Sequence, residues 1–133
     1  MRRLWMILIV INIMALAISR QASSEEFIVY SIYKEVDLGI PNDPPQKDFY
    51  INMGAQNGLR DGSKLQVLRK LATYDLTSQK LYKDVTFPIA KLKVIHVEAN
   101  AAIARLEQVL PGTQAPAISP RAVMIGDLVK NTE

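Results

Sequence analysis

One histidine and several aspartates are the side chains of this sequence that could act in acid–base or metal chemistry. His96 is the single histidine in 133 residues, and no second ligand lies near it in the sequence. The loop aspartates, whose spacing does not follow the calcium-binding pattern, are Asp43, Asp48, Asp61, Asp75 and Asp84. A catalytic pair would form only if folding brought two such groups together. We therefore expect no catalytic residue, metal ligand or cofactor. An exported hydrolase is an alternative that would rest on Asp48, Asp61 or His96.

Composition excludes further chemistry. The chain has no cysteine, which removes a disulfide framework, a thiol nucleophile, a cysteine zinc site and a lipidated cysteine. The net charge is +3, and Arg2 and Arg3 at the N-terminus contribute two of these charges. Binding to nucleic acid needs a clustered excess of Lys and Arg. The nearly neutral remainder therefore predicts no nucleic-acid partner.

Five residues are candidates for contact with a partner. Tyr50, Tyr74 and Tyr82, together with two further tyrosines at 30 and 33, could line an aromatic groove for a proline-rich peptide. Half-buried strand tyrosines explain the same pattern without a partner. Lys91 and Lys93 share one face of a predicted strand, where they could meet an acidic partner or an anionic glycan. A solvated strand face is the competing interpretation.

The N-terminal segment has the pattern of an export signal. Arg2 and Arg3 precede an apolar run from Leu4 to Ile18, and Ser19 follows as a small residue. The run is shorter than the roughly 20 residues of a typical spanning helix. Residues 1–22 are therefore expected to form an apolar helix that is either a cleaved signal peptide or a membrane anchor through residues 4–18. Both alternatives place the rest in the periplasm, soluble or held at the inner membrane.

The elements that would carry these residues are short strands. Runs rich in β-branched and aromatic residues, separated by Gly, Pro, Asn and Asp clusters, predict strands at 27–33, 49–52, 65–69, 85–97, 101–106 and 122–125. The run 101–106 has a helix as its alternative, and 74–80 is expected to be a hairpin loop or a short linker. The pattern indicates an all-β fold, a small barrel or sandwich. We divide the exported part into an N-terminal strand with a Pro-rich connection, 23–46, and a β-barrel domain, 47–130.

Glycines mark the turns of that barrel. Gly54, Gly58 and Gly62 are spaced by four residues, and the last two follow Asn57 and Asp61 in strong turn pairs. Leu59 between them is expected to point into the core. Near the C-terminus, Gly126-Asp127 is expected to form a similar turn. No Lys-Ser or Lys-Thr follows the glycines as a phosphate-binding loop requires, so we interpret them as structural.

These residues resemble a known family. A strand, the spacing Gly-x-x-x-Gly-Leu-x-x-Gly over 54–62, and a strand at 64–69 are similar to the C-terminal domain of the flagellar H-ring assembly protein T. The later strand 90–94, the run 102–104 and the closing Gly-Asp-x-Val at 126–129 continue the resemblance, which spans about 47–130. It implies an SH3-like barrel and a periplasmic, non-enzymatic role, with no catalytic residues. The family's larger preceding domains have no counterpart here, so assembly of a whole ring is not implied.

The functional hypothesis is a non-enzymatic exported module that docks onto a cell-envelope machine, with a flagellar one as the candidate. The expected partner is an envelope protein complex, and a homo-oligomer or ring is a second possibility. An uncleaved N-terminus would add contact with the membrane. The alternative function is a module that binds peptidoglycan through the tyrosines and lysines named above.

Overall fold

The structure is a computed structural model that describes residues 25–113, 116–118 and 120–132. The predicted N-terminal apolar helix, residues 1–22, lies outside this range. Within the described part of the chain, no helix is long and apolar enough to cross a membrane. The described residues comprise the predicted β-domain and the strand that precedes it.

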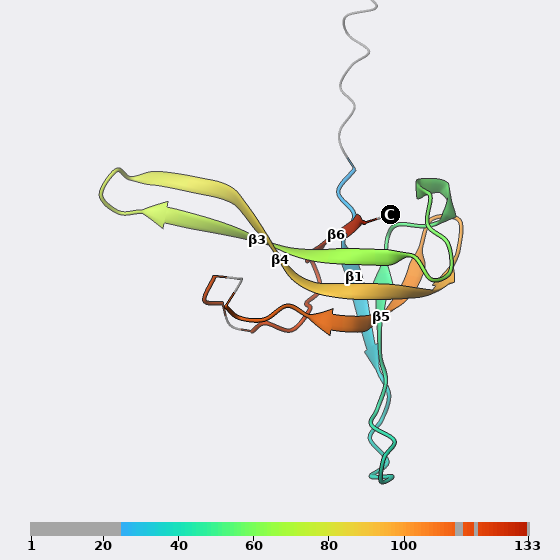
Figure 1. The fold of residues 1–133 in the computed structure, drawn as a ribbon. Coiled ribbons are helices and arrows are strands. Elements are labelled where there is room, and N and C mark those ends of the chain that lie inside the picture. Colours follow the sequence, from blue (N-terminus) through green and yellow to red (C-terminus); the bar gives the residue numbers. More distant parts are fainter. Residues whose placement is uncertain (1–24, 114–115, 119, 133) are drawn as a thin grey trace, which may run out of the picture.

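Six strands and one short 3-10 helix make up the fold, which confirms the all-β prediction (Figure 1). The elements are β1 (Val29–Lys34), β2 (Lys47–Ile51), η1 (Ala55–Asn57), β3 (Lys64–Asp75), β4 (Lys80–Val97), β5 (Ala102–Val109) and β6 (Leu128–Asn131). The run at 101–106 is a strand and not a helix, because it pairs with β2 on one side and β4 on the other.

All strands lie in one antiparallel sheet with the order β1-β2-β5-β4-β3-β6. Its two outer strands also meet. Ile28 bridges Leu128, and the Val29 amide donates to the Asp127 carbonyl at 2.9 Å. The Val129 amide donates to the Phe27 carbonyl at 2.8 Å. The sheet is therefore closed, which is the arrangement that removes exposed strand edges.

The core fills the inside of this closed sheet. Alternating residues of each strand point inward, as the strand periodicity requires. On β3 these are Leu65 and Val67, and on β4 they are Leu92 and Val94, all buried. Leu59 is 2% exposed and lies in the same core cluster. After Val94 the apolar residues Ile95 and Val97 no longer follow the inward alternation of Leu92 and Val94, and β4 shifts its register against β5 between Val94 and His96.

Two parts of the chain project from the closed sheet (Figure 1). The distal halves of β3 and β4, residues 70–86, form a two-stranded hairpin that we call the arm. The connection between β1 and β2, residues 35–46, forms a long loop that we call the acidic loop. The arm is longer than the sequence suggests, because Tyr74, Asp75 and Lys80 belong to strands and the turn occupies only 76–79.

One predicted strand is wrong. Residues 122–125 are not a strand, and the last strand begins at Leu128. The Ala122 carbonyl instead accepts a hydrogen bond from the Arg69 side chain at 2.8 Å. The Met124 amide donates to the Asp127 carboxylate at 2.7 Å. The Arg69 and Asp127 side chains thus form hydrogen bonds with backbone groups that would otherwise pair with a neighbouring strand, and the segment turns instead.

Candidate interaction surfaces

The arm exposes large apolar side chains on both faces. Tyr74 lies opposite Leu81, and Thr73 lies opposite Tyr82. Directly opposed residues share a face and successive residues alternate, so Tyr74 and Tyr82 point to opposite sides. Tyr74 is 56% exposed and Leu76, in the turn, is 83% exposed. Beyond Leu68 of β3 and before Ala90 of β4, these two strands pair only with each other among the described strands.

A carboxylate fixes the tip of the arm. Asp75 accepts hydrogen bonds from the Thr77 amide at 2.9 Å and from the Ser78 hydroxyl. These hydrogen bonds lower the pKa of Asp75 below its ordinary value. The bond from the Ser78 hydroxyl is the main cause, and the bonds from the backbone amides add to it. Gln79 completes the turn with a positive φ of 54°. The tip is thus ordered by its own side chains while its apolar residues remain exposed.

A second surface is basic and lies on the outer side of the sheet. Lys93 on β4 is directly opposite Lys64 on β3 and Arg105 on β5. Gln66 on β3 is opposite Lys91 on one side and Lys130 of β6 on the other. The register therefore gathers cations from four strands. We call these residues the lysine face: Lys64, Lys91, Lys93, Arg105 and Lys130.

Two of these cations are neutralised within the molecule. The Arg105 Nε lies 2.7 Å from the Asp48 Oδ1, and the Lys64 Nζ lies 3.0 Å from the Glu107 Oε1. The hydrogen bond to Asp48, and its charge, raise the pKa of Arg105, and the charge of Glu35 adds to the effect. Lys91, Lys93 and Lys130 have no ion pair with any residue that the structure describes.

The acidic loop carries charge of the opposite sign. Glu35, Asp37 and Asp43 are its charged residues, and residues 35–46 contain no Lys or Arg. The Glu35 carboxylate accepts from the Gln46 amide at 3.0 Å, and Asp37 accepts from the Gly39 amide at 2.9 Å. None of the three carboxylates forms an ion pair within the described part of the chain.

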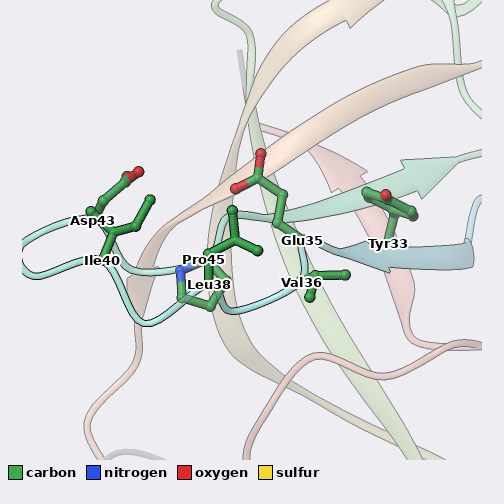
Figure 2. A pocket seen from close by; sticks show the side chains of 7 residues that line it. All are labelled: Tyr33, Glu35, Val36, Leu38, Ile40, Asp43 and Pro45. Atoms are coloured by element: carbon green, nitrogen blue, oxygen red, sulfur yellow. The ribbon is translucent and has the colours of Figure 1, made fainter.

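A hollow of about 310 Å³ opens in this loop (Figure 2). Its walls combine apolar groups with two carboxylates, and they consist of Tyr33, Glu35, Val36, Leu38, Ile40, Asp43 and Pro45. Figure 2 shows Tyr33 at one end, on β1, and Asp43 and Ile40 at the other, toward the tip of the loop. Val36 is 77% exposed and Leu38 76%, so the loop does not bury its own apolar residues.

The predicted tyrosines occupy three separate places. Tyr50 of β2 is half-buried and packs edge-on against Tyr30, with ring centroids 6.3 Å apart. This pair lines a small hollow with His96, Glu98 and residues 101–103. Tyr33 lines the hollow of the acidic loop, and Tyr74 and Tyr82 lie on the arm. The five tyrosines therefore do not form one groove.

The residues considered for hydrolysis have different partners. Asp48 forms an ion pair with Arg105, and the His96 Nε2 lies 2.8 Å from the Glu98 Oε1. Asp61 is exposed in the turn before β3. Among the described residues there is no group of three His, Cys, Asp or Glu side chains that could hold a metal ion.

The glycines of the turn segment differ in what they do. Gly58, Gly62 and Gly126 have φ values of 87°, 86° and 93°, the left-handed region that glycine adopts without strain. Gly54 has an extended backbone, and glycine is required there because neighbouring backbone atoms leave no room for a side chain. A Cβ atom there would lie 2.4 Å from the Glu98 carbonyl oxygen and 2.6 Å from the Ala101 nitrogen. Asp127 is buried and pairs with Arg69.

Sequence reasoning found Lys91 and Lys93 but missed the rest of the lysine face. Lys64, Arg105 and Lys130 lie far from them in the chain, and only the strand register brings them together. The acidic loop was also missed as a surface. Its signal was present, because three carboxylates stand among proline and exposed aliphatic residues without a single cation.

These observations define the class of the protein as a small all-β domain with a closed antiparallel sheet and two projecting segments. Residues 46–113 match the family model of the flagellar assembly protein T, C-terminal domain. The chain belongs to this family and is a component of flagellar assembly, which confirms the resemblance drawn from the sequence. The match covers β2 to β5 and the whole arm. No curated protein matches the chain.

Proposed function

We propose that the chain is a non-enzymatic docking module of flagellar assembly that works in the periplasm, built on an SH3-like barrel. Through the arm it binds a protein of the flagellar machine in the cell envelope. The observation that carries this proposal is the family match, which includes the entire arm. The export signal predicted from residues 1–22 supports the compartment.

The arm has the properties of a docking element. Tyr74, Leu76 and Leu81 are each at least half exposed, and Tyr82 is 50% exposed on the opposite face. Exposed apolar groups gathered on one element are typical of protein contact sites. Tyrosine offers a large contact area at a small loss of side-chain freedom. A partner that receives the arm would bury both of its faces at once.

Copurification from cells tests this function. The tagged full chain is crosslinked in growing cells, and the captured proteins are identified by mass spectrometry. We expect a protein of the flagellar basal body, and we expect the double variant Tyr74→Ser/Tyr82→Ser to lose it. Tyr33→Ser, which removes an exposed tyrosine outside the arm, is the matched control. Capture that is unchanged in the double variant, or that yields no flagellar protein, would contradict the proposal.

The state of the N-terminus is tested separately. Mass spectrometry of the protein from cells reports its first residue. A start near Arg20 means a soluble periplasmic protein, and an intact Met1 means a membrane-anchored one. A full-length chain found in the cytosolic fraction would overturn the proposed compartment.

A second function, binding to peptidoglycan, is favoured by the hollow beside Tyr30 and Tyr50. Aromatic rings next to the polar pair His96 and Glu98 resemble the mixed surfaces on which proteins bind small ligands. Sedimentation with purified cell-wall sacculi distinguishes the two functions, because only this one predicts direct retention. Tyr50→Leu should then abolish retention while leaving capture of the flagellar protein unchanged.

A further inference from the structure

An apolar row crosses the outer side of the sheet. Leu128 of β6 bridges Ile28 on one side and lies opposite Leu68 of β3 on the other. The next residue of each strand, or the one before it, is a buried valine, so strand alternation turns these three side chains outward. All three are only half-buried. We call Ile28, Leu68 and Leu128 the apolar row.

The unpaired cations of the lysine face lie directly beside this row. Lys130, two residues after Leu128, lies opposite Gln66 of β3. Gln66 lies opposite Lys91 of β4 on its other side, and Lys93 follows two residues along β4. Residues two apart in a strand share a face, so the apolar row and the lysine face form one continuous surface.

This surface remains positive after its internal ion pairs are counted. Glu107 neutralises Lys64, and Asp48 neutralises Arg105. Lys93 lies directly opposite both of these cations and has no ion pair with a described residue. Like charges placed opposite each other destabilise a sheet. An anion from outside the domain would relieve this repulsion.

We propose that the lysine face and the apolar row lie on a bilayer that contains anionic phospholipids. Such a bilayer offers phosphate groups to the lysines and an apolar layer directly below them for the apolar row. The lysine side chain suits this boundary, because its apolar stem can lie in that layer while its charged end stays in water. A soluble polyanion offers charge alone and leaves the apolar row exposed.

The length of the N-terminal segment keeps the domain within reach of a bilayer. Six residues separate the apolar run that ends at Ile18 from the first described residue, Glu25. An extended chain spans at most about 3.5 Å per residue, so a retained run holds Glu25 within about 25 Å of the membrane. The chain then enters the fold at β6, where the Val129 amide donates to the Phe27 carbonyl at 2.8 Å (Figure 1). This entry point borders the lysine face.

The acidic loop lies away from that entry point. β1 begins beside β6 and leads to the loop at its other end, so Figure 1 shows the loop far from the place where the chain enters. Asp37 and Asp43 in the loop would be repelled by anionic headgroups. The loop is therefore expected to stay off the bilayer, which makes it a suitable reference position.

Fluorescence quenching in reconstituted vesicles tests the contact, because the chain has no cysteine and a single one can be labelled. The full chain with Gln66→Cys carries a fluorophore, and a fraction of the lipid headgroups carries a quencher. We expect stronger quenching in mixed phosphatidylglycerol and phosphatidylcholine vesicles than in phosphatidylcholine alone, and added salt should reduce the difference. Asp37→Cys, labelled in the same way, should show no such difference. Equal quenching at position 66 in the two vesicle types, or the same increase at position 37, would overturn the proposal.

Charge reversal identifies the residues responsible. A lysine near an anionic surface strengthens binding about fivefold, so Lys91→Glu/Lys93→Glu should weaken the contact by at least about 25-fold. Lys34→Glu/Lys47→Glu makes the same change in charge at two exposed lysines that lie opposite each other on β1 and β2, outside the lysine face. Quenching at position 66 should persist in this control. An equal loss in both double variants would mean that net charge alone acts, and the assigned surface would be wrong.

The outcome is independent of the proposed function, because the charge-reversed variants keep the arm. Loss of the quenching difference with intact capture of the flagellar protein supports both proposals. Equal quenching of the unaltered surface in both vesicle types, with intact capture, overturns only the bilayer contact. Absence of capture in the unaltered chain overturns only the docking function. Retention on purified sacculi that Lys91→Glu/Lys93→Glu abolishes, without a quenching difference between vesicles, would assign the lysine face to a cell-wall polymer and overturn the bilayer contact.

Discussion

Arg69 and Asp127 form a buried two-point ion pair that joins β3 to the turn before β6. The Arg69 Nε lies 2.9 Å from the Asp127 Oδ1, and the Nη2 lies 2.7 Å from the Oδ2. The same guanidinium donates to the carbonyls of Pro120 and Ala122. The hydrogen bond to Asp127 is the main cause of a raised Arg69 pKa, against the opposing effect of burial. One side chain therefore holds the C-terminal segment on the sheet.

Asp127→Asn should destabilise the domain strongly. The substitution keeps the shape of the side chain but leaves the Arg69 charge buried without its partner, which costs about 3–5 kcal/mol in comparable cases. Urea denaturation measures the free energy of unfolding. Glu26→Gln makes the same chemical change in the exposed pair with Lys70, where the cost is at most about 1 kcal/mol. Equal effects of the two substitutions would show that the buried pair does not hold the C-terminal segment.

Asparagine should destabilise the domain far more at Gly54 than at Gly58. At Gly58 the backbone is left-handed and a Cβ atom meets no atom within 4 Å, and asparagine tolerates this conformation. At Gly54 the Cβ atom would meet three backbone atoms closer than 3.0 Å, and the backbone of residues 98–101 cannot move aside without breaking its turn. We expect Gly54→Asn to cost about 1–3 kcal/mol or more and Gly58→Asn less than about 0.5 kcal/mol. Thermal denaturation of both variants checks the order, and a reversed order would contradict the assigned roles.

The strands could be predicted because their local pattern and their tertiary role agree. Leu65 and Val67 alternate with polar neighbours, and the alternation alone places them inside. The same alternation puts residue 69 inside as well, although an arginine there suggests a solvent-facing position. Its buried partner, Asp127, lies 58 residues away. No local pattern reveals such a distant pair, so the strand alternation alone does not show which side chain would neutralise Arg69 in the core.

The surfaces could be predicted only in part for a related reason. Lys91 and Lys93 stand two residues apart, so the strand period alone places them on one face. Lys64 and Lys130 join them through the pairing of β3 with β4 and β6, and register depends on the whole sheet. The strand expected at 122–125 was wrong for the same physical reason, because Arg69 binds that segment from a distant strand.

Leucines in the arm and in the core should differ sharply when they are shortened. Leu65→Ala removes a fully buried side chain, for which we expect a loss of about 2–5 kcal/mol. Leu81→Ala changes a residue that is 51% exposed, and the expected loss is below about 0.5–1 kcal/mol. Urea denaturation of the two variants measures both losses. A large loss at Leu81 would mean that the arm supports the fold, and the interpretation of arm variants as binding defects would then fail.

The tip of the arm should depend on pH through Asp75. Its carboxylate binds the Ser78 hydroxyl and the amides of residues 77 and 78, which favours the charged form and lowers the pKa. For a lowered pKa, the stabilisation of the tip is complete above the pKa of an unfolded aspartate and is lost as pH falls through the lowered value. Carbon-13 NMR of the Asp75 carboxyl group over an acid titration measures this value. Ser78→Ala removes the main cause, so the pKa should rise toward the ordinary value while the core signals stay unchanged. An Asp75 pKa that is the same with and without the hydroxyl would show that the tip is not held by this side chain.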